Sequence, residues 1–483
     1  MSKSIFKNSI YKLILSTFNL FVPLLVTPYV SSLLNKELYG TYNTANAMLG
    51  FFLVFAVFGV YNYGVREISK VRDDKKKLEA LFTNLFFFSV ITSLATSFLY
   101  FLYVMFAVKT ADQPTYLLML IQISGNILSI EWLNEAVENY GFITKKTIVV
   151  RLLYIVSIFV FVKTPQDVIP YGLIMSLTVV INNAVSYFYV KKHIRFNFSD
   201  FKLTKYIKPL FILLCISNIN ILYTQLDKIF LGQFVSGISN TEYTLPANIT
   251  NMIGVMLISL IVVSIPRLSY YVSHNMERDY MALLNKSTRA FFLVLCPACI
   301  GLCCLSYEAM NLYTNGDYAY AYPVLQVFAL RFLISSLYSI FTNQILYIRG
   351  KERSMIKILL VGGVLNTIFD IGLLVVGQLT PVSAIVSTAI AETIMLSIMY
   401  WYIRVKVKVP FKLFAFNNMK YLYYSLPFFA ITYFIRLLEL GVLMNCAIII
   451  PLCGLTYFVI LFVTKDDMLF YFTDKIKAKI LRK

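Results

Sequence analysis

Fourteen long apolar runs follow one another along this chain, and basic residues gather in every second gap between them. All but six of the 43 Lys and Arg residues lie in these alternate gaps, at their edges or at the two termini; Lys145–Arg151 is one such gap. The intervening gaps hold only Lys36, Lys109 and Lys163. Because basic side chains near helix ends stay on the cytoplasmic side, the alternation predicts a multi-pass membrane protein with both termini in the cytoplasm.

The composition excludes an ordinary soluble domain, since 59% of the residues are hydrophobic and only 14% are charged. Lipid cannot satisfy open backbone groups, and no alternating pattern suggests a barrel, so the runs are predicted to be helices. The net charge of +19 lies on one membrane face and requires no nucleic acid partner. The predicted fold class is therefore all-α and integral to the membrane, with fourteen transmembrane helices.

A long basic connection divides the chain after the sixth predicted helix. A weak internal sequence repeat supports two pseudo-symmetric six-helix lobes. Tyr42–Asn46 follows the first predicted helix, and the similar segment Tyr243–Asn248 follows the seventh. The predicted organisation is an N-lobe over 1–190, the basic cytoplasmic connection 191–208, a C-lobe over 209–404, and two further helices with a basic tail over 405–483.

Ionisable residues inside the apolar runs are functional candidates, because each costs at least ~2.5–3.5 kcal/mol at the bilayer centre. Arg331 and Glu392 lie deep within their runs, and Asp370 lies in the outer half of its run. Two interpretations of Arg331 and Glu392 are open: they line a water-filled passage, or they form a buried structural pair between helices. Glu392 and Asp370 are candidates for ion coupling.

Two further pairs of opposite charge lie near helix ends. Asp227 is followed by Lys228, and Arg436 lies three residues before Glu439. Both pairs are predicted to sit at the interface or to be paired locally. Asp227 is a third candidate for ion coupling.

An acidic segment ends the fourth run. Glu131, Glu135 and Glu138 are spaced i, i+4, i+7, which predicts one shared helix face. Three like charges cannot face lipid, so they face water, a cation or basic neighbours such as Arg66, unless they belong to a solvated cytoplasmic helix end. Both interpretations are open.

Neutral polar side chains are also dense within the runs, Asn19 and Asn62 among them. Singly such residues usually bond to neighbouring helices, but together they permit a hydrophilic cavity for hydroxyl-rich cargo. The sequence contains no phosphate-binding glycine loop and no nucleophile–base arrangement. It therefore predicts a protein that is not an enzyme, needs no cofactor or metal, and uses an ion gradient, the membrane potential or substrate consumption as its energy source.

Several segments, in this order, resemble the bacterial polysaccharide flippases of the multidrug/oligosaccharidyl-lipid/polysaccharide exporter superfamily. The most distinctive is Glu131-Trp132 with Glu138 and Tyr140. The other matching segments are Thr27–Tyr29, Leu34–Gly40, Tyr63–Asp74, Leu226–Gly232, Gln344–Lys351, Gly362–Asn366 and Ala389–Glu392. The chain departs from the family at Asn134–Val137, where an aromatic residue and a glycine are usual.

The resemblance implies a two-lobed flippase in the bacterial cytoplasmic membrane. Its cargo would be undecaprenyl-diphosphate-linked oligosaccharide repeat units, moved from the inner to the outer leaflet by alternating access for capsule, O-antigen or other surface polysaccharide. Arg66 and Arg331 would replace the hydration of the diphosphate, with Glu131, Glu135, Glu138, Asn19 and Asn62 as further binding candidates. Membrane lipids are expected partners, and so are a glycan polymerase and glycosyltransferases.

Other functions stay open from sequence. The nearest are a peptidoglycan lipid-precursor flippase or a drug/cation exporter of the same superfamily, although a deep Arg331 is untypical of a cation exporter. A membrane glycan polymerase is disfavoured, because such enzymes need a sizeable outer loop and no predicted outer connection here is long.

Overall fold

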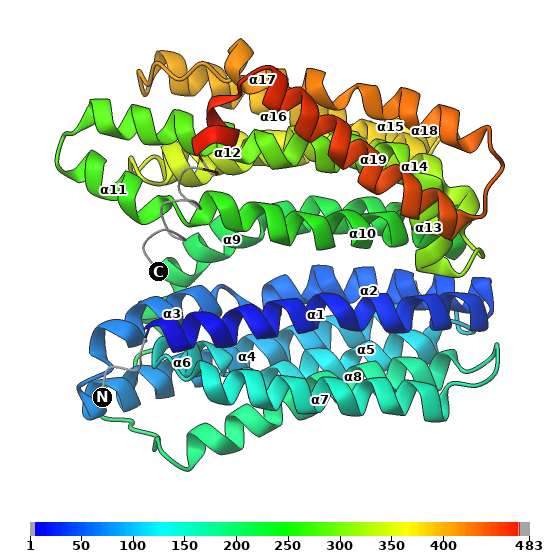
Figure 1. Ribbon diagram of the computed structural model, residues 1–483. Helices are drawn as coiled ribbons and strands as arrows, with labels where there is room; N and C mark the ends of the chain where they lie inside the picture. The colour runs from blue at the N-terminus through cyan, green and yellow to red at the C-terminus, as the bar shows by residue number, and fades with distance from the viewer. Residues whose placement is uncertain (1–4, 472, 474–483) are drawn as a thin grey trace. The chain divides into compact units, whose positions relative to one another are not determined.

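The computed structural model describes residues 5–471 and 473, and the side chains among these except 5–9 and 215–224. Within this part of the chain every regular element is a helix (Figure 1). Eleven helices of the described residues are long and apolar enough to cross a membrane. The predicted all-α membrane class is thus confirmed, whereas the count of fourteen helices and the cytoplasmic termini stay predictions.

The chain divides into two compact units, Met1–Thr241 and Glu242–Lys483. The helices of the first unit are α1 (Ile5–Leu33), α2 (Lys36–Val57), α3 (Val60–Val71), α4 (Lys75–Ala107), α5 (Gln113–Gly125), η1 (Asn126–Leu128), α6 (Glu131–Ala136), α7 (Tyr140–Phe161), α8 (Val168–Lys191), α9 (Thr204–Phe230) and the π-helical η2 (Leu231–Val235). Helix α9 packs against α2 and lies in this unit. The division into an N-lobe over 1–190 and a C-lobe over 209–404 stays a prediction. The symmetry of the lobes stays a prediction.

The second unit contains most of α10 (Gly237–Val262) and the helices that follow it. These are α11 (Ile265–Ser273), α12 (Glu277–Cys304), α13 (Ser306–Thr314), η3 (Ala319–Ala321), α14 (Tyr322–Ser339), the π-helical η4 (Ile340–Leu346), α15 (Glu352–Val375), α16 (Pro381–Val405), α17 (Phe416–Ser425), α18 (Pro427–Arg436) and α19 (Val442–Val463). Within it α14 and α15 both pack against α16.

The second predicted span is broken between α2 and α3. Phe58 and Gly59 both have left-handed backbone angles, with φ of 45° and 76°, which end one helix before the next begins. At Gly59 an added Cβ would also lie 2.7 Å from the Leu210 carbonyl oxygen. A residue without a side chain is therefore required at this kink.

The predicted connection Lys145–Arg151 is wrong. These residues lie inside α7, and the preceding break in the helix is at Val137–Asn139. The prediction assumed that every cation lies at the membrane interface. Lys146 is instead buried, with 2% of its side chain exposed. A lysine with a carboxylate partner can be accommodated inside a helix bundle, which is why the rule fails here.

Candidate functional site

The fourth span of the first unit is interrupted near its acidic end. Helix α5 ends at Gly125, the chain passes through the short 3-10 turn η1, and Ser129 is extended before α6 begins. The Asn183 amide donates to the Gly125 carbonyl (3.4 Å), and the Trp132 indole donates to the Ser129 carbonyl (3.2 Å). Irregular backbone at membrane depth needs such substitute partners. The interruption is thus a stable part of the fold that re-aims the side chains of α6.

Glu131, the first residue of α6, meets a buried lysine. The Lys146 ammonium on α7 lies 3.0 Å from both carboxylate oxygens of Glu131, and it donates to the Ser186 hydroxyl on α8 at 2.7 Å. Ser186 in turn donates to Glu131. The Lys146 side chain is 2% exposed and that of Glu131 20%. Three helices are therefore joined by one neutralised cluster, which we call the Glu131 cluster.

The predicted common face of the three glutamates is wrong, because the helix does not continue past Ala136. Glu138 has a φ of 56° and pairs with Arg72 at 2.8 Å, at the end of α3. The hydrogen bond from Arg72 to Glu138 raises the pKa of the Arg72 guanidinium. Glu135 faces the Tyr61 hydroxyl of α3. Each acid thus has its own surroundings, and their mutual repulsion is relieved.

The remaining candidates of the first unit are dispersed. Arg66 on α3 is 55% exposed and pairs with the adjacent Glu67 at 2.8 Å. Asn62 on α3 and Asn19 on α1 are both exposed. Asp227, near the end of α9, is 1% exposed. Arg66 is thus the accessible cation among these candidates.

In the second unit the structure brings Arg331 and Glu392 together. Arg331 on α14 donates from Nε (2.9 Å) and Nη2 (2.5 Å) to the two carboxylate oxygens of Glu392 on α16. The two side chains are 14% and 8% exposed. Such a bidentate geometry fixes both groups and neutralises them. Of the two interpretations open from sequence, the pair between helices is the arrangement found here.

Asp370 forms a second buried polar group on the neighbouring helix. It is fully buried on α15 and accepts hydrogen bonds from the Ser387 hydroxyl of α16 (2.6 Å) and from the Asn366 amide one turn earlier (3.2 Å). Ser387 lies five residues before Glu392, so α16 carries both polar contacts along one helix. Helix α16 is therefore the element around which the candidates of this unit are arranged.

Arg436 and Glu439 were predicted to lie at the interface or to pair locally, and the local pair is wrong. The interfacial position stays a prediction. Arg436, at the end of α18, binds Glu308 of α13 through Nε (3.0 Å) and Nη2 (2.6 Å), and also donates to the Cys304 carbonyl. Glu308 is 1% exposed. A buried carboxylate takes precedence over a nearer one in sequence because it cannot obtain its partner from water.

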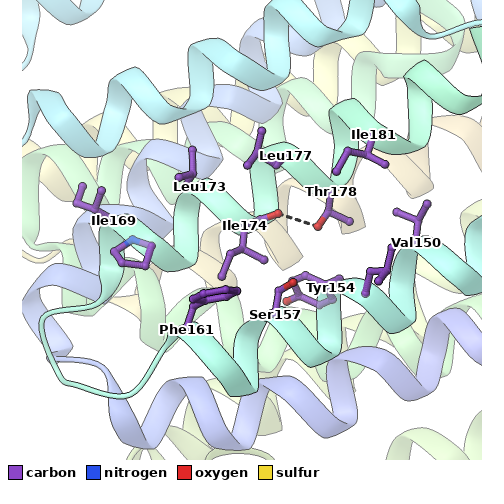
Figure 2. Close-up of a pocket in the computed structure, with 12 residues that line it drawn as sticks. Val150, Tyr154, Ser157, Phe161, Ile169, Leu173, Ile174, Leu177, Thr178 and Ile181 are labelled. Carbon is purple, nitrogen blue, oxygen red and sulfur yellow. Dashed lines mark hydrogen bonds between the residues drawn. The ribbon is translucent and has the colours of Figure 1, made fainter.

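A groove of about 460 Å³ lies between α7 and α8. Figure 2 shows Leu173, Ile174 and Leu177 of α8 facing Tyr154 and Phe161 of α7. Its few polar groups include the Thr178 hydroxyl, which already donates to the Ile174 carbonyl of its own helix (2.7 Å). A groove of this composition suits hydrocarbon rather than sugar, so the polar clusters are the better candidates for chemistry.

Sequence reasoning missed Lys146, Ser186 and Glu308, the partners that define these clusters. Lys146 lies fifteen residues after Glu131, Ser186 a further forty residues on, and Glu308 lies 128 residues before Arg436. None of these separations has a helical or strand period. The only local signal was a lysine or a glutamate inside or beside an apolar run.

Comparison with known proteins gives a consistent result. The chain matches the family described as "Polysaccharide biosynthesis protein" over residues 5–272. It is 25% identical over 175 residues to a protein of Escherichia coli (strain K12) named "Putative O-antigen transporter", and this match spans 36% of the chain and 42% of the relative. A protein of Shigella dysenteriae with the same name is 20% identical over 374 residues, or 75% of the chain and 91% of that relative.

Among solved structures, the chain is similar to the lipid II flippase MurJ in an inward closed conformation. The TM-score is 0.72 at 14% identity, over 96% of this chain and all of that one. An inward-facing multidrug resistance MATE family transporter of the MOP superfamily gives a TM-score of 0.59 at 12% identity, over 83% of this chain and 99% of the other. At these identities the likeness establishes a shared fold.

Proposed function

Because the chain belongs to the polysaccharide biosynthesis protein family, we propose that it is a flippase for undecaprenyl-diphosphate-linked oligosaccharide repeat units. It would move them from the inner to the outer leaflet of the cytoplasmic membrane by alternating access, for capsule or other surface polysaccharide. The family match, the names of the two bacterial relatives and the shared transporter fold support this proposal. Glycosyltransferases would supply the cargo, and a glycan polymerase would consume it.

The observation that carries the mechanism is the ion pair of Arg331 with Glu392 inside a membrane span. A diphosphate offers oxygens in the same forked geometry as a carboxylate, so it can replace Glu392 as the partner of Arg331. Glu392 would then be a buried carboxylate without a counter-charge, a state that is strongly unfavourable unless the surrounding helices move. Cargo binding and a rearrangement of α14 and α16 would thus be linked through one guanidinium.

The membrane potential would add to this exchange. An inside-negative potential favours outward movement of an anion by about 2.3 kcal/mol per charge per 100 mV. Arg66 is exposed near the basic end of α3, which supports a role in the first contact with the diphosphate. The proposal therefore assigns capture to Arg66 and the coupled step to Arg331 and Glu392.

A mutant set with a matched control tests the role of the pair. We expect Arg331→Gln and Glu392→Gln each to lower protein levels, because a buried charge that loses its partner costs on the order of 3–5 kcal/mol. The double variant removes both charges and should restore the protein level. Surface glycan should nevertheless remain absent in the double variant, since the group that binds diphosphate is missing.

The control is the double variant Arg436→Gln/Glu308→Gln, which removes a similar bidentate pair from the same unit. It should export glycan normally once its protein level is matched. Normal export by Arg331→Gln/Glu392→Gln would show that this pair is only structural and would contradict the mechanism. The flippase assignment itself is tested separately, because deletion of the gene should accumulate lipid-linked glycan on the inner leaflet.

A further inference from the structure

A pocket of about 380 Å³ lies at the end of α16, in the second unit, and none of its lining residues belongs to the clusters described above. Its walls are the last two turns of α16, with Ser397, Trp401 and Arg404, and the segment that follows the helix, with Leu413 and Phe414. It combines aromatic and aliphatic walls with one guanidinium and two hydroxyls, those of Ser397 and Tyr400. This composition is that of a site for an amphipathic ligand with a negative group.

The pocket is built by the chain folding back after α16. The Tyr400 hydroxyl and the Arg404 Nη1 both donate to the carbonyl of Phe411, at 3.4 and 3.3 Å. The Phe411 side chain is fully buried, and the ring of Phe414 packs edge-on against Tyr400 at 6.0 Å. These contacts hold Arg404 beside the pocket, and the bond to the Phe411 carbonyl uses one of the five N–H donors of a guanidinium. The guanidinium is thus positioned in advance for a ligand.

The location of the pocket indicates which kind of ligand it can bind. Helix α16 is a candidate membrane span that ends at Val405, so the pocket lies at one end of the hydrocarbon layer. Trp401 and Phe414 are 55% and 64% exposed, and large aromatic residues of this kind favour the membrane interface. The segment after the helix adds three exposed cations, Lys406, Lys408 and Lys412.

We propose that this pocket binds the headgroup of an anionic phospholipid. The phosphate accepts hydrogen bonds from Arg404, the surrounding lysines supply the attraction for negative charge, and the start of the acyl chains rests on the exposed rings of Trp401 and Phe414. A soluble anion would leave the aromatic wall unused, and a neutral lipid would leave the cations unused. The anionic lipid uses both.

The tryptophan in the pocket provides a direct test. The chain has two tryptophans, Trp132 and Trp401, and Trp132 is 2% exposed. The full-length protein is reconstituted into phosphatidylcholine vesicles that contain a small fraction of brominated phosphatidylglycerol or brominated phosphatidylcholine. We expect half-maximal quenching of Trp401 at a roughly fivefold lower fraction of the anionic lipid. Trp401→Phe gives the contribution of Trp132.

Two variants separate the pocket from diffuse attraction. Arg404→Gln should abolish the preference, whereas Arg278→Gln, which removes an exposed arginine at the start of α12, should keep it. Ser397→Leu fills the pocket without a change in charge and should also abolish it. Equal quenching by both lipids, or a preference that survives Ser397→Leu, would overturn the proposal. Recovery of Trp401 emission on addition of inorganic phosphate would assign the site to a soluble anion instead.

Discussion

The Glu131 cluster makes an asymmetric prediction about stability. Glu131→Gln would leave the ammonium of Lys146 almost fully buried without a counter-charge, since only 2% of that side chain is exposed. Lys146→Met would leave Glu131 with 20% of its side chain exposed and with the Ser186 hydroxyl still donating to it. Breaking a buried pair costs about 3–5 kcal/mol. Glu131→Gln should therefore fall at the upper end of this range and Lys146→Met below it.

The assay is thermal unfolding of the detergent-purified protein, followed by size-exclusion chromatography after heating. The double variant Glu131→Gln/Lys146→Met should unfold close to the wild-type temperature, because no charge is then left buried. Lys70→Met is the matched control, since the Lys70 side chain on α3 is 61% exposed and the variant should unfold within about a degree of the wild type. Additive losses in the double variant, or equal losses in the two single variants, would refute the reasoning.

Two further comparisons, each of two single substitutions, test the packing of the helices. In Gly64→Ala the new Cβ would lie 2.4 Å from Cε3 of Trp132, so we expect a loss of about 1–3 kcal/mol, whereas Gly372→Ala, where no atom lies within 4 Å of the Cβ position, should unfold like the wild type. Arg436→Gln should lower the unfolding temperature more than Glu308→Gln does, because it strands a carboxylate that is 1% exposed while the guanidinium is 39% exposed. Both comparisons use the same unfolding assay, and a reversed order in either would contradict the packing described.

The sequence predicted the membrane class well because that class depends on sums over many residues. Apolar runs of sufficient length become helices whatever their partners are, and eleven such helices are found in the described part of the chain. The position of one connection was wrong because it depended on three cations, one of which, Lys146, is itself buried and paired with a carboxylate. A prediction that sums over many residues thus tolerates one exceptional residue, whereas the predicted position of a single helix boundary does not.

The candidate site was predictable only in part for the same physical reason. A charge inside an apolar run costs free energy in the membrane and therefore needs a reason to be there. Arg331 and Glu392 were singled out on this ground. Their pairing depends on how α14 packs against α16, and 61 residues separate them in the chain. The break before α6 also had no proline to announce it. Tertiary packing, rather than the local sequence pattern, decides which residue neutralises each buried charge.

The pairs in the membrane differ in a way that bears on function. A buried ion pair is weak evidence for stability, because apolar residues of similar volume often hold a bundle together as well. The Arg436–Glu308 pair joins α18 to α13 at helix ends, where such a link has a structural use. The Arg331–Glu392 pair joins α14 to the middle of α16, and α16 also carries the Ser387 contact to Asp370. Apolar packing could join α14 to α16 equally well, and the proposed exchange of partner during transport would give the charges at this position a use.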